Sequence, residues 1–328
     1  MPKISLRSYF QRIDKLIDNG DYDEAIQHSR YLLSLYPKCV NAYRSLAKAL
    51  LERKNNPEAR DIFTRVLAVY PDDFISHVGL SIIYENEGNL DASIWHMELA
   101  YDVEPSNPVL TEELRRLFGR RDGIQPPKIR MTRGALIRMY ARGELYQQAI
   151  SECQEVLKDD PRRLDIQLIL AQMQYLSGSL LESSDICSKI LEGSPYCFEA
   201  NRLMIEIIPR TSQNIAVTLY KSRLDEVDPY FKFVTSAEMN SSDIPDDAIM
   251  VEFLDEDNMP ALAAGQNWTE SKITPSEPQR EAPPDRENTP LPAIPTENPV
   301  RASAALSGVM SLSSDSDELE KSHDEFIK

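Results

Sequence analysis

The stretch GDYDEAIQHSRYLLSLYP, residues 20–37, contains the three markers that decide the fold of this chain. It opens with a glycine, has an alanine at position 25 and closes with a proline. The proline recurs at intervals of 34 residues in two series: Pro37, Pro71 and Pro105, then Pro161, Pro195 and Pro229. A fixed period of roughly 20–50 residues indicates a stacked-repeat protein.

The other two markers keep the phase of the prolines. Val217 lies twelve positions before the last proline, and before the other five the residue is small: Ala25, Ala59, Ser93, Ala149 and Ser183. Seventeen positions before three of the prolines lies a glycine: Gly20, Gly88 and Gly178. The stretch GELYQQAI, residues 143–150, repeats GDYDEAI with one residue inserted. A helical bundle without repeats would not keep these intervals equal, so we expect six stacked units.

On these residues the chain resembles the tetratricopeptide repeat family over roughly residues 5–231. Repeats of that family have 34 residues folded as two antiparallel helices, with a turn glycine, a small residue on the second helix and a closing proline. The family's aromatic residue on the first helix is matched by Tyr9 and Tyr43, and His77 takes its place in the third unit. The last three units depart from the pattern with other residues: Arg133, Gln167 and Asn201.

The hydrophobic pattern supports the same fold class. Each unit shows two runs of about 12–14 residues with apolar residues three and four apart, which is typical of amphipathic helices. One such pair cannot bury its apolar face alone, so neighbouring pairs must stack. The predicted fold is therefore an all-α, right-handed solenoid of antiparallel helix pairs.

The repeat is interrupted once. Pro105 and Pro161 are 56 residues apart, 22 more than the period. Asn107 and Pro108 predict the start of an extra helix that ends at Gly119 and caps the third unit. The alternative is a degenerate seventh repeat that has lost its second helix. We expect three repeats and this capping helix in residues 1–119, an extended linker at 120–130 and three further repeats in residues 131–233.

The C-terminal part differs in composition. Residues 235–328 carry 20 acidic and 6 basic side chains, which accounts for most of the net charge of −17. Proline, serine and acidic residues dominate, and such segments bury too little apolar surface to fold. We therefore expect a disordered acidic tail from residue 234 to residue 328, with one acidic and hydrophobic patch at 244–257.

The chain lacks the patterns of catalysis, of cofactor binding and of metal binding. Its four histidines, among which His28 and His96 are expected to face outward, have no partner at metal-binding spacing, and its four cysteines form no zinc-type pair. There is no glycine-rich phosphate loop and no nucleophile elbow. No segment has the apolar length of a membrane helix or a signal peptide. We expect a non-catalytic, cytoplasmic protein without cofactors that binds no membrane.

Solenoids of this type bind partners in the concave groove lined by the first helix of each pair. The expected groove residues are Arg7, Phe10, Asn41, Arg44, Lys48, Ile75, Val78 and Ile82, with Asp14 beside them. A groove with a cationic middle and an apolar end suits an amphipathic acidic peptide. In the alternative interpretation, Arg44 and Lys48 pair with neighbouring acids such as Glu52.

A basic cluster surrounds the interruption: Arg115, Arg116, Arg120, Arg121, Lys128, Arg130, Arg133, Arg138 and Arg142. It is interpreted as a solvated face, as a docking surface for an acidic segment, or as a nucleic-acid contact. The last is disfavoured because stacking aromatics are not interleaved.

The main prediction is a protein-interaction scaffold that binds a peptide or helical segment of a protein partner. The alternative is an autoinhibited module whose acidic tail docks on its own basic or groove surface, and a nucleic-acid-associated factor comes third. For the alternative, we expect residues 244–257 to dock across the basic cluster or into a nearby groove through apolar anchors: Ile249, Val251, Phe253 and Leu254.

Overall fold

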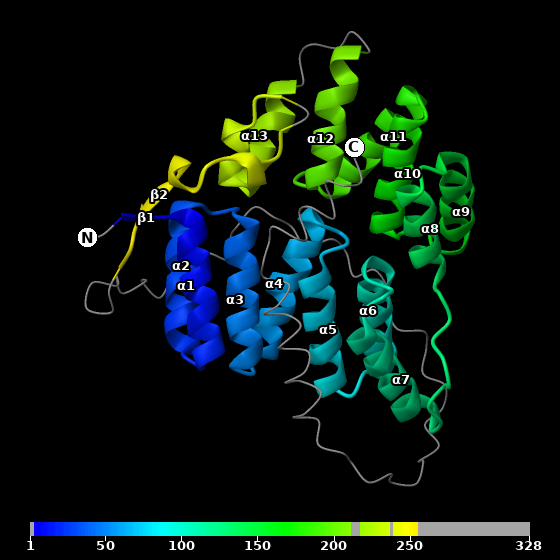
Figure 1. Ribbon diagram of the computed structural model, residues 1–328, viewed down its shortest axis with the longest axis horizontal. Helices are drawn as coiled ribbons and strands as arrows, with labels where there is room; N and C mark the ends of the chain where they lie inside the picture. The colour runs from blue at the N-terminus through cyan, green and yellow to red at the C-terminus, as the bar shows by residue number, and fades with distance from the viewer. Residues whose placement is uncertain (1–2, 211–216, 237–238, 255–328) are drawn as a thin grey trace.

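The computed structural model describes residues 3–210, 217–236 and 239–254, and these are mainly helical (Figure 1). The first three units are six helices in antiparallel pairs: α1 (Leu6–Asn19), α2 (Tyr22–Leu35), α3 (Val40–Glu52), α4 (Asn56–Val69), α5 (Phe74–Asn86) and α6 (Leu90–Val103). The last three units repeat the arrangement: α8 (Arg133–Arg142), α9 (Tyr146–Asp159), α10 (Leu164–Leu176), α11 (Leu180–Gly193), α12 (Phe198–Ile207) and α13 (Val217–Val227). The predicted all-α solenoid of helix pairs is confirmed.

The small residues of the repeat lie where two helices of a pair meet. Ala25, Ala59 and Ala149 are 0% exposed, and so are the serines that replace alanine, Ser93 and Ser183. A small side chain lets the two helix backbones approach closely, so these positions set the spacing within each pair. The core of α1–α6 is separate from the two smaller cores of the later units.

The turn between the helices of a pair uses a left-handed residue. Gly20, Gly88 and Gly178 have φ of 90°, 79° and 89°. The equivalent residues in two other units are not glycine, since Lys54 has φ of 63° and Glu144 has φ of 56°. The interpretation of GELYQQAI as a one-residue insertion is thus wrong at the turn, because Gly143 has φ of −84° and Glu144 takes the left-handed place.

The extra helix after the third unit is longer than predicted. Helix α7 (Pro108–Asp122) begins as expected, with the Asn107 side chain accepting a hydrogen bond from Val109 N. It ends at Gly123, with φ of 78°, rather than at Gly119. Gly119 is small for a different reason: a Cβ there would lie 2.5 Å from Gln125 Cγ, so the returning chain needs the space. The predicted linker therefore begins at residue 123.

The segment after α13 is folded onto the first repeat. It contains four short elements: η2 (Pro229–Phe233), η3 (Ser241–Asp243), η4 (Asp246–Ala248) and β2 (Met250–Glu252). Strand β2 pairs antiparallel with β1 (Lys3–Ser5). The prediction that disorder begins at residue 234 is wrong for residues 239–254, because their alternating apolar side chains join the core of α1–α7. The rest of the predicted tail, 255–328, lies outside the described residues.

The last units of the array contact the first ones. Figure 1 shows α13 and the segment after it lying across the ends of α1–α3, next to β1 and β2, with α12 nearer to α5. The Phe198 ring of α12 stacks on Tyr70 with centroids 5.2 Å apart, and Lys38 donates a hydrogen bond to Tyr196 Oη at 2.6 Å. Val227 and Tyr230 are buried in the core of the first triple. The array therefore closes on itself.

Two histidines lie side by side in the third unit, with His77 buried and His96 half-buried. His77 Nδ1 lies 3.1 Å from His96 Nδ1, and His77 Nε2 lies 3.1 Å from Pro71 O. Burial lowers the pKa of His77 and lowers that of His96 well below 6.5. The expectation that His28 and His96 face outward is wrong: His28 is 1% exposed, and its Nδ1 lies 2.8 Å from Tyr9 Oη, in the equivalent position of the first unit.

We predict that Glu144→Gly raises the free energy of unfolding by about 0.5–1 kcal/mol. A left-handed conformation costs a non-glycine residue about 1–2 kcal/mol, and glycine avoids this cost. Glycine also has a larger entropy in the unfolded state, which offsets part of the gain in stability. Urea unfolding of the variant and of Glu144→Ala provides the comparison. The alanine variant should show no gain, and equal behaviour of both would contradict the prediction.

The buried histidines predict a loss of stability in acid. Below pH 6.5, His77 and His96 become protonated in the unfolded state but stay neutral in the folded state. The free energy of unfolding therefore falls as the pH falls. Each histidine contributes at most about 1.4 kcal/mol per pH unit. Melting temperatures measured from pH 7.5 to 5.5 should fall less steeply in His96→Phe than in the wild type, and identical slopes would contradict this account.

Candidate functional site

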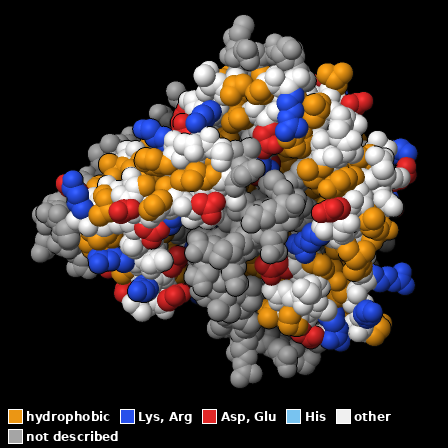
Figure 2. All heavy atoms as spheres, turned by 45° about the horizontal axis from the view of Figure 1, so that its top comes forward, with side chains coloured by type: hydrophobic (Ala, Val, Ile, Leu, Met, Phe, Trp, Pro, Cys, Tyr) orange, Lys and Arg blue, Asp and Glu red, His pale blue; other side chains and the backbone are white. Residues whose placement is uncertain are grey.

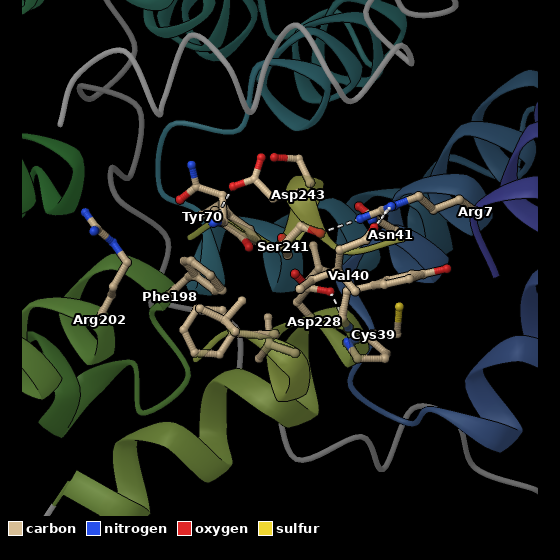
Figure 3. A pocket seen from close by; sticks show the side chains of 18 of the residues that line it. Arg7, Cys39, Val40, Asn41, Tyr70, Phe198, Arg202, Asp228, Ser241 and Asp243 are labelled. Carbon is tan, nitrogen blue, oxygen red and sulfur yellow. Dashed lines mark hydrogen bonds between the residues drawn. The ribbon is translucent and has the colours of Figure 1, made fainter. Parts of the chain in front are cut away.

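A cavity of about 900 Å³ lies between the first triple and the returning C-terminal segment. One wall comes from α1, α3 and the start of α5, and the other from α12, η2 and residues 234–236 and 239–246. Figure 3 shows Arg7, Asn41 and Tyr70 on the first wall and Phe198, Asp228 and Ser241 on the second.

Most of the predicted groove residues line this cavity: Arg7, Phe10, Asn41, Arg44, Lys48 and Ile75, with Asp14 beside them. Val78 and Ile82 do not line it and are buried in the core at 0% and 6% exposure. Helix α5 is buried around nearly its whole circumference and packs against α3, α4 and α6. The apolar end of the predicted groove is therefore core.

The cations of the cavity are paired with acids. Arg44 Nε lies 2.7 Å from Asp73 Oδ1, and Lys48 Nζ lies 3.4 Å from Asp14 Oδ1. On the opposite wall Arg202 pairs with glutamates of its own helix. Eight carboxylates and six cations are among the described lining residues, so the predicted cationic middle is wrong. The alternative interpretation expects acidic partners for Arg44 and Lys48, and Asp73 and Asp14 are among these partners.

Burial acts on these acids in two ways. Asp14 is removed from water, and this raises its pKa although Lys48 opposes the shift. Asp73 is also buried, which favours the neutral acid, but the Arg44 guanidinium and hydrogen bonds from Ser76 outweigh burial and lower its pKa. Asp73 is therefore a fixed negative charge that orients Arg44.

Aromatic rings join the two walls. Phe198 stacks on Tyr70, and its ring meets Phe231 edge-on with centroids 5.6 Å apart. The Arg44 guanidinium lies 4.9 Å from the Tyr70 ring centroid. Such surfaces bind apolar and planar groups of a partner. The sequence period did not predict Phe198 and Phe231 as site residues. The contact between the last units and the first ones joins residues far apart in the chain, and the repeat pattern does not encode it.

Arg7 is bound by the C-terminal segment of the same chain. Its Nη1 donates to Ile244 O at 2.6 Å and to Asp246 Oδ1 at 2.8 Å, and Nη2 donates to Ser241 O at 2.5 Å. The guanidinium also lies 4.1 Å from the Tyr230 ring centroid. Residues 241–246 thus occupy one predicted groove residue. The described part of the acidic patch lies at this end of the groove and not on the basic cluster.

The residues of the basic cluster make local ion pairs. Arg116 and Arg120 share Glu85, while Arg115, Arg121 and Arg133 pair with other acids. Arg142 donates to Val103 O at 3.3 Å, and Lys128 and Arg130 are exposed in the linker. On the face shown in Figure 2, acidic and basic side chains of the described residues are likewise interspersed. This geometry matches the interpretation of the cluster as a solvated face.

Arg138 departs from the cluster because it is buried. It lies 3.5 Å from Asp72 and 3.6 Å from Asp165, and Arg163 links Asp165 at 2.7 Å to Asp102 at 3.0 Å. Arg163 and Arg138 hold the pKa of Asp165 down to about 2 in spite of burial. This network connects α6, α8 and α10, so it joins the two triples.

The helical pairs and the residue pattern agree with a family model. Residues 16–80 match the model described as "Tetratricopeptide repeat". These residues of the chain are tetratricopeptide repeats. The matched residues run from the end of α1 through α2, α3 and α4 to the middle of α5. Repeats of this family form protein-interaction scaffolds in general.

Comparison with whole proteins adds little to this family assignment. No curated protein matches the sequence of this chain. Among solved structures, one titled "Functional Characterization of Pseudomonas Aeruginosa pilF" is 14% identical, with 68% of this chain and 91% of that chain covered and a TM-score of 0.28. Another, titled "MamA MSR-1 C2", is 15% identical, with 56% and 93% covered and a TM-score of 0.25.

The described part of the chain has neither a group of metal ligands nor a membrane-spanning helix. No three His, Cys, Asp or Glu side chains are grouped there as a metal site requires. The four cysteines are free and buried, and burial raises the pKa of the Cys39 thiol to about 12. None of the described helices combines the length and the apolar content that crossing a bilayer requires.

We predict that Arg163→Met lowers the free energy of unfolding by about 3–5 kcal/mol, because Asp102 and Asp165 stay buried without their main counter-charge. The neighbouring Arg162 has a side chain that is 63% exposed, so Arg162→Met is a matched control that should change stability by no more than about 0.5 kcal/mol. Urea unfolding measures both. A loss below about 1 kcal/mol at position 163 would contradict a joining role for the network.

Proposed function

We propose that this protein is a non-catalytic, cytoplasmic interaction scaffold that binds a peptide or helical segment of a partner protein in the central cavity. The observation that carries the proposal is the convergence of six predicted groove residues on one cavity of about 900 Å³. Concave faces of helix-pair solenoids are binding surfaces. The four free thiols accord with a reducing compartment.

The walls favour an amphipathic segment of low net charge. Each described cation on the first wall already has a carboxylate or carbonyl partner, so an acidic peptide would have to displace acids. The aromatic surface of Tyr70, Phe198 and Phe231 offers contact with apolar side chains. Nucleic acid is disfavoured, because phosphate binding needs a concentration of unpaired basic residues.

Autoinhibition is the second candidate function, and the contacts of Arg7 favour it. Residues 241–246 place two carbonyls and one carboxylate on a guanidinium that would otherwise face the groove. In this version the segment narrows the cavity until a partner displaces it.

The first prediction of the scaffold proposal concerns where a partner is captured. With p-benzoylphenylalanine in place of Gln11, which is exposed on the cavity wall, ultraviolet light should crosslink a defined protein from lysate of the source cells. The same replacement at Gln147, exposed on α9 outside the cavity, is the control. Equal capture at both positions, measured by mass spectrometry, would contradict binding in the cavity.

The second prediction tests autoinhibition. Asp246→Asn removes the charged acceptor of Arg7 and should loosen residues 241–246, so the crosslinking yield at position 11 should rise several-fold. Asp247→Asn changes the neighbouring exposed carboxylate and should leave the yield unchanged. If both variants match the parent chain, residues 241–246 form a fixed part of the cavity wall and do not inhibit.

A further inference from the structure

Residues 249–254 lie on the first repeat as a strand of alternating pattern. Strand β2 pairs with β1 in the register Lys3 to Glu252, Ile4 to Val251 and Ser5 to Met250, and Leu6 N donates to Ile249 O at 3.0 Å. Ile249 and Val251 are buried, whereas Met250 and Glu252 are exposed. Backbone pairing therefore fixes the register, and alternate side chains fill the surface of the repeat.

The end of this strand inserts an aromatic side chain into a pocket. The Phe253 ring lies 5.2 Å from the His28 ring at an interplanar angle of 17° and 5.1 Å from the Tyr9 ring. The Arg12 guanidinium lies 4.4 Å from the same ring and covers it. Tyr9 Oη is 2.8 Å from His28 Nδ1, so the first repeat holds the walls of this pocket with its own hydrogen bond.

Charge is complementary across this contact. The repeat contributes Lys3 and Arg12, and the strand contributes Glu252, which is opposite Lys3 in the pairing register. Just before the strand, Asp246 pairs with Arg7 at 2.8 Å. The surface therefore fits a segment in which carboxylates flank buried apolar residues and a phenylalanine.

We propose that this surface, formed by β1, α1 and α2, is a docking site for an acidic aromatic strand of another protein, and that residues 249–254 are its resident competitor. A two-stranded sheet of three residues per strand is marginal alone, so the resident strand can exchange. Helices α1 and α2 keep a core of their own when the strand leaves, because Ile13 of α1 and Ala25 and Leu32 of α2 belong to the buried core of the repeat array. Tyr9, Arg12 and His28, which surround the Phe253 ring, do not line the central cavity, although the Arg7–Asp246 pair borders both sites. The proposal does not depend on the function proposed for the cavity.

The test uses the nine-residue peptide DDAIMVEFL, residues 246–254, labelled with fluorescein and titrated with the full-length chain. Phe253→Ala weakens the resident strand, so this variant should bind the peptide at least tenfold more tightly than the wild type in fluorescence polarisation. Phe233→Ala is the matched control, because Phe233 belongs to the same C-terminal segment but is 41% exposed. A peptide with alanine in place of its phenylalanine should bind the Phe253→Ala chain at least tenfold more weakly.

A second chain keeps the test decisive if Phe253→Ala does not fold. Lys3 and Glu252 are exposed partners in a non-hydrogen-bonded pair, where side chains approach closely, so Lys3→Cys with Glu252→Cys allows a disulfide that locks the resident strand. The reduced form should bind the peptide and the oxidised form should bind it at least tenfold more weakly. Equal affinity of the two forms, or of folded Phe253→Ala and Phe233→Ala chains, would overturn the proposal.

Discussion

A helix pair of this repeat has an apolar face that only another pair can cover, and the whole molecule follows from that constraint. Buried small residues such as Ala25 and Ala59 let the helices of a pair approach, and each pair then presents a surface for the next. Stacking would continue indefinitely without a cover at each end. Here the first repeat is covered by residues 239–254 of the same chain, and the third unit by α7.

The sequence predicted the features that depend on local chemistry. The proline phase located the helix pairs, and Asn107 and Pro108 located the start of α7. Six of the residues proposed for the groove line the central cavity. The sequence did not predict Phe198 and Phe231 as cavity residues, nor Val78 and Ile82 as core. Both depend on where the second triple lies relative to the first, and that placement comes from contacts between residues far apart in the chain.

The composition does not show which basic residues form ion pairs at the surface and which are buried. Nine basic residues lie near the interruption in the sequence and look like one cluster. Most of them form ion pairs at the surface, where each pair contributes little to the free energy of unfolding. Arg138 instead belongs with Arg163 to a buried network whose acids sit on three different elements. Its position in a repeat helix gave no sign of this, since the acids come from other units.

The pairing of β1 with β2 also orders events during synthesis. Ser5 leaves the ribosome early, whereas its strand partner Met250 follows only after more than 240 further residues. At roughly 5–20 residues per second, the first repeat waits on the order of 10–50 s before its covering strand exists. During that interval the pocket of Tyr9, His28 and Arg12 is open on every nascent chain. A strand of another protein with the chemistry of residues 249–254 would therefore meet no resident competitor while this chain is being made.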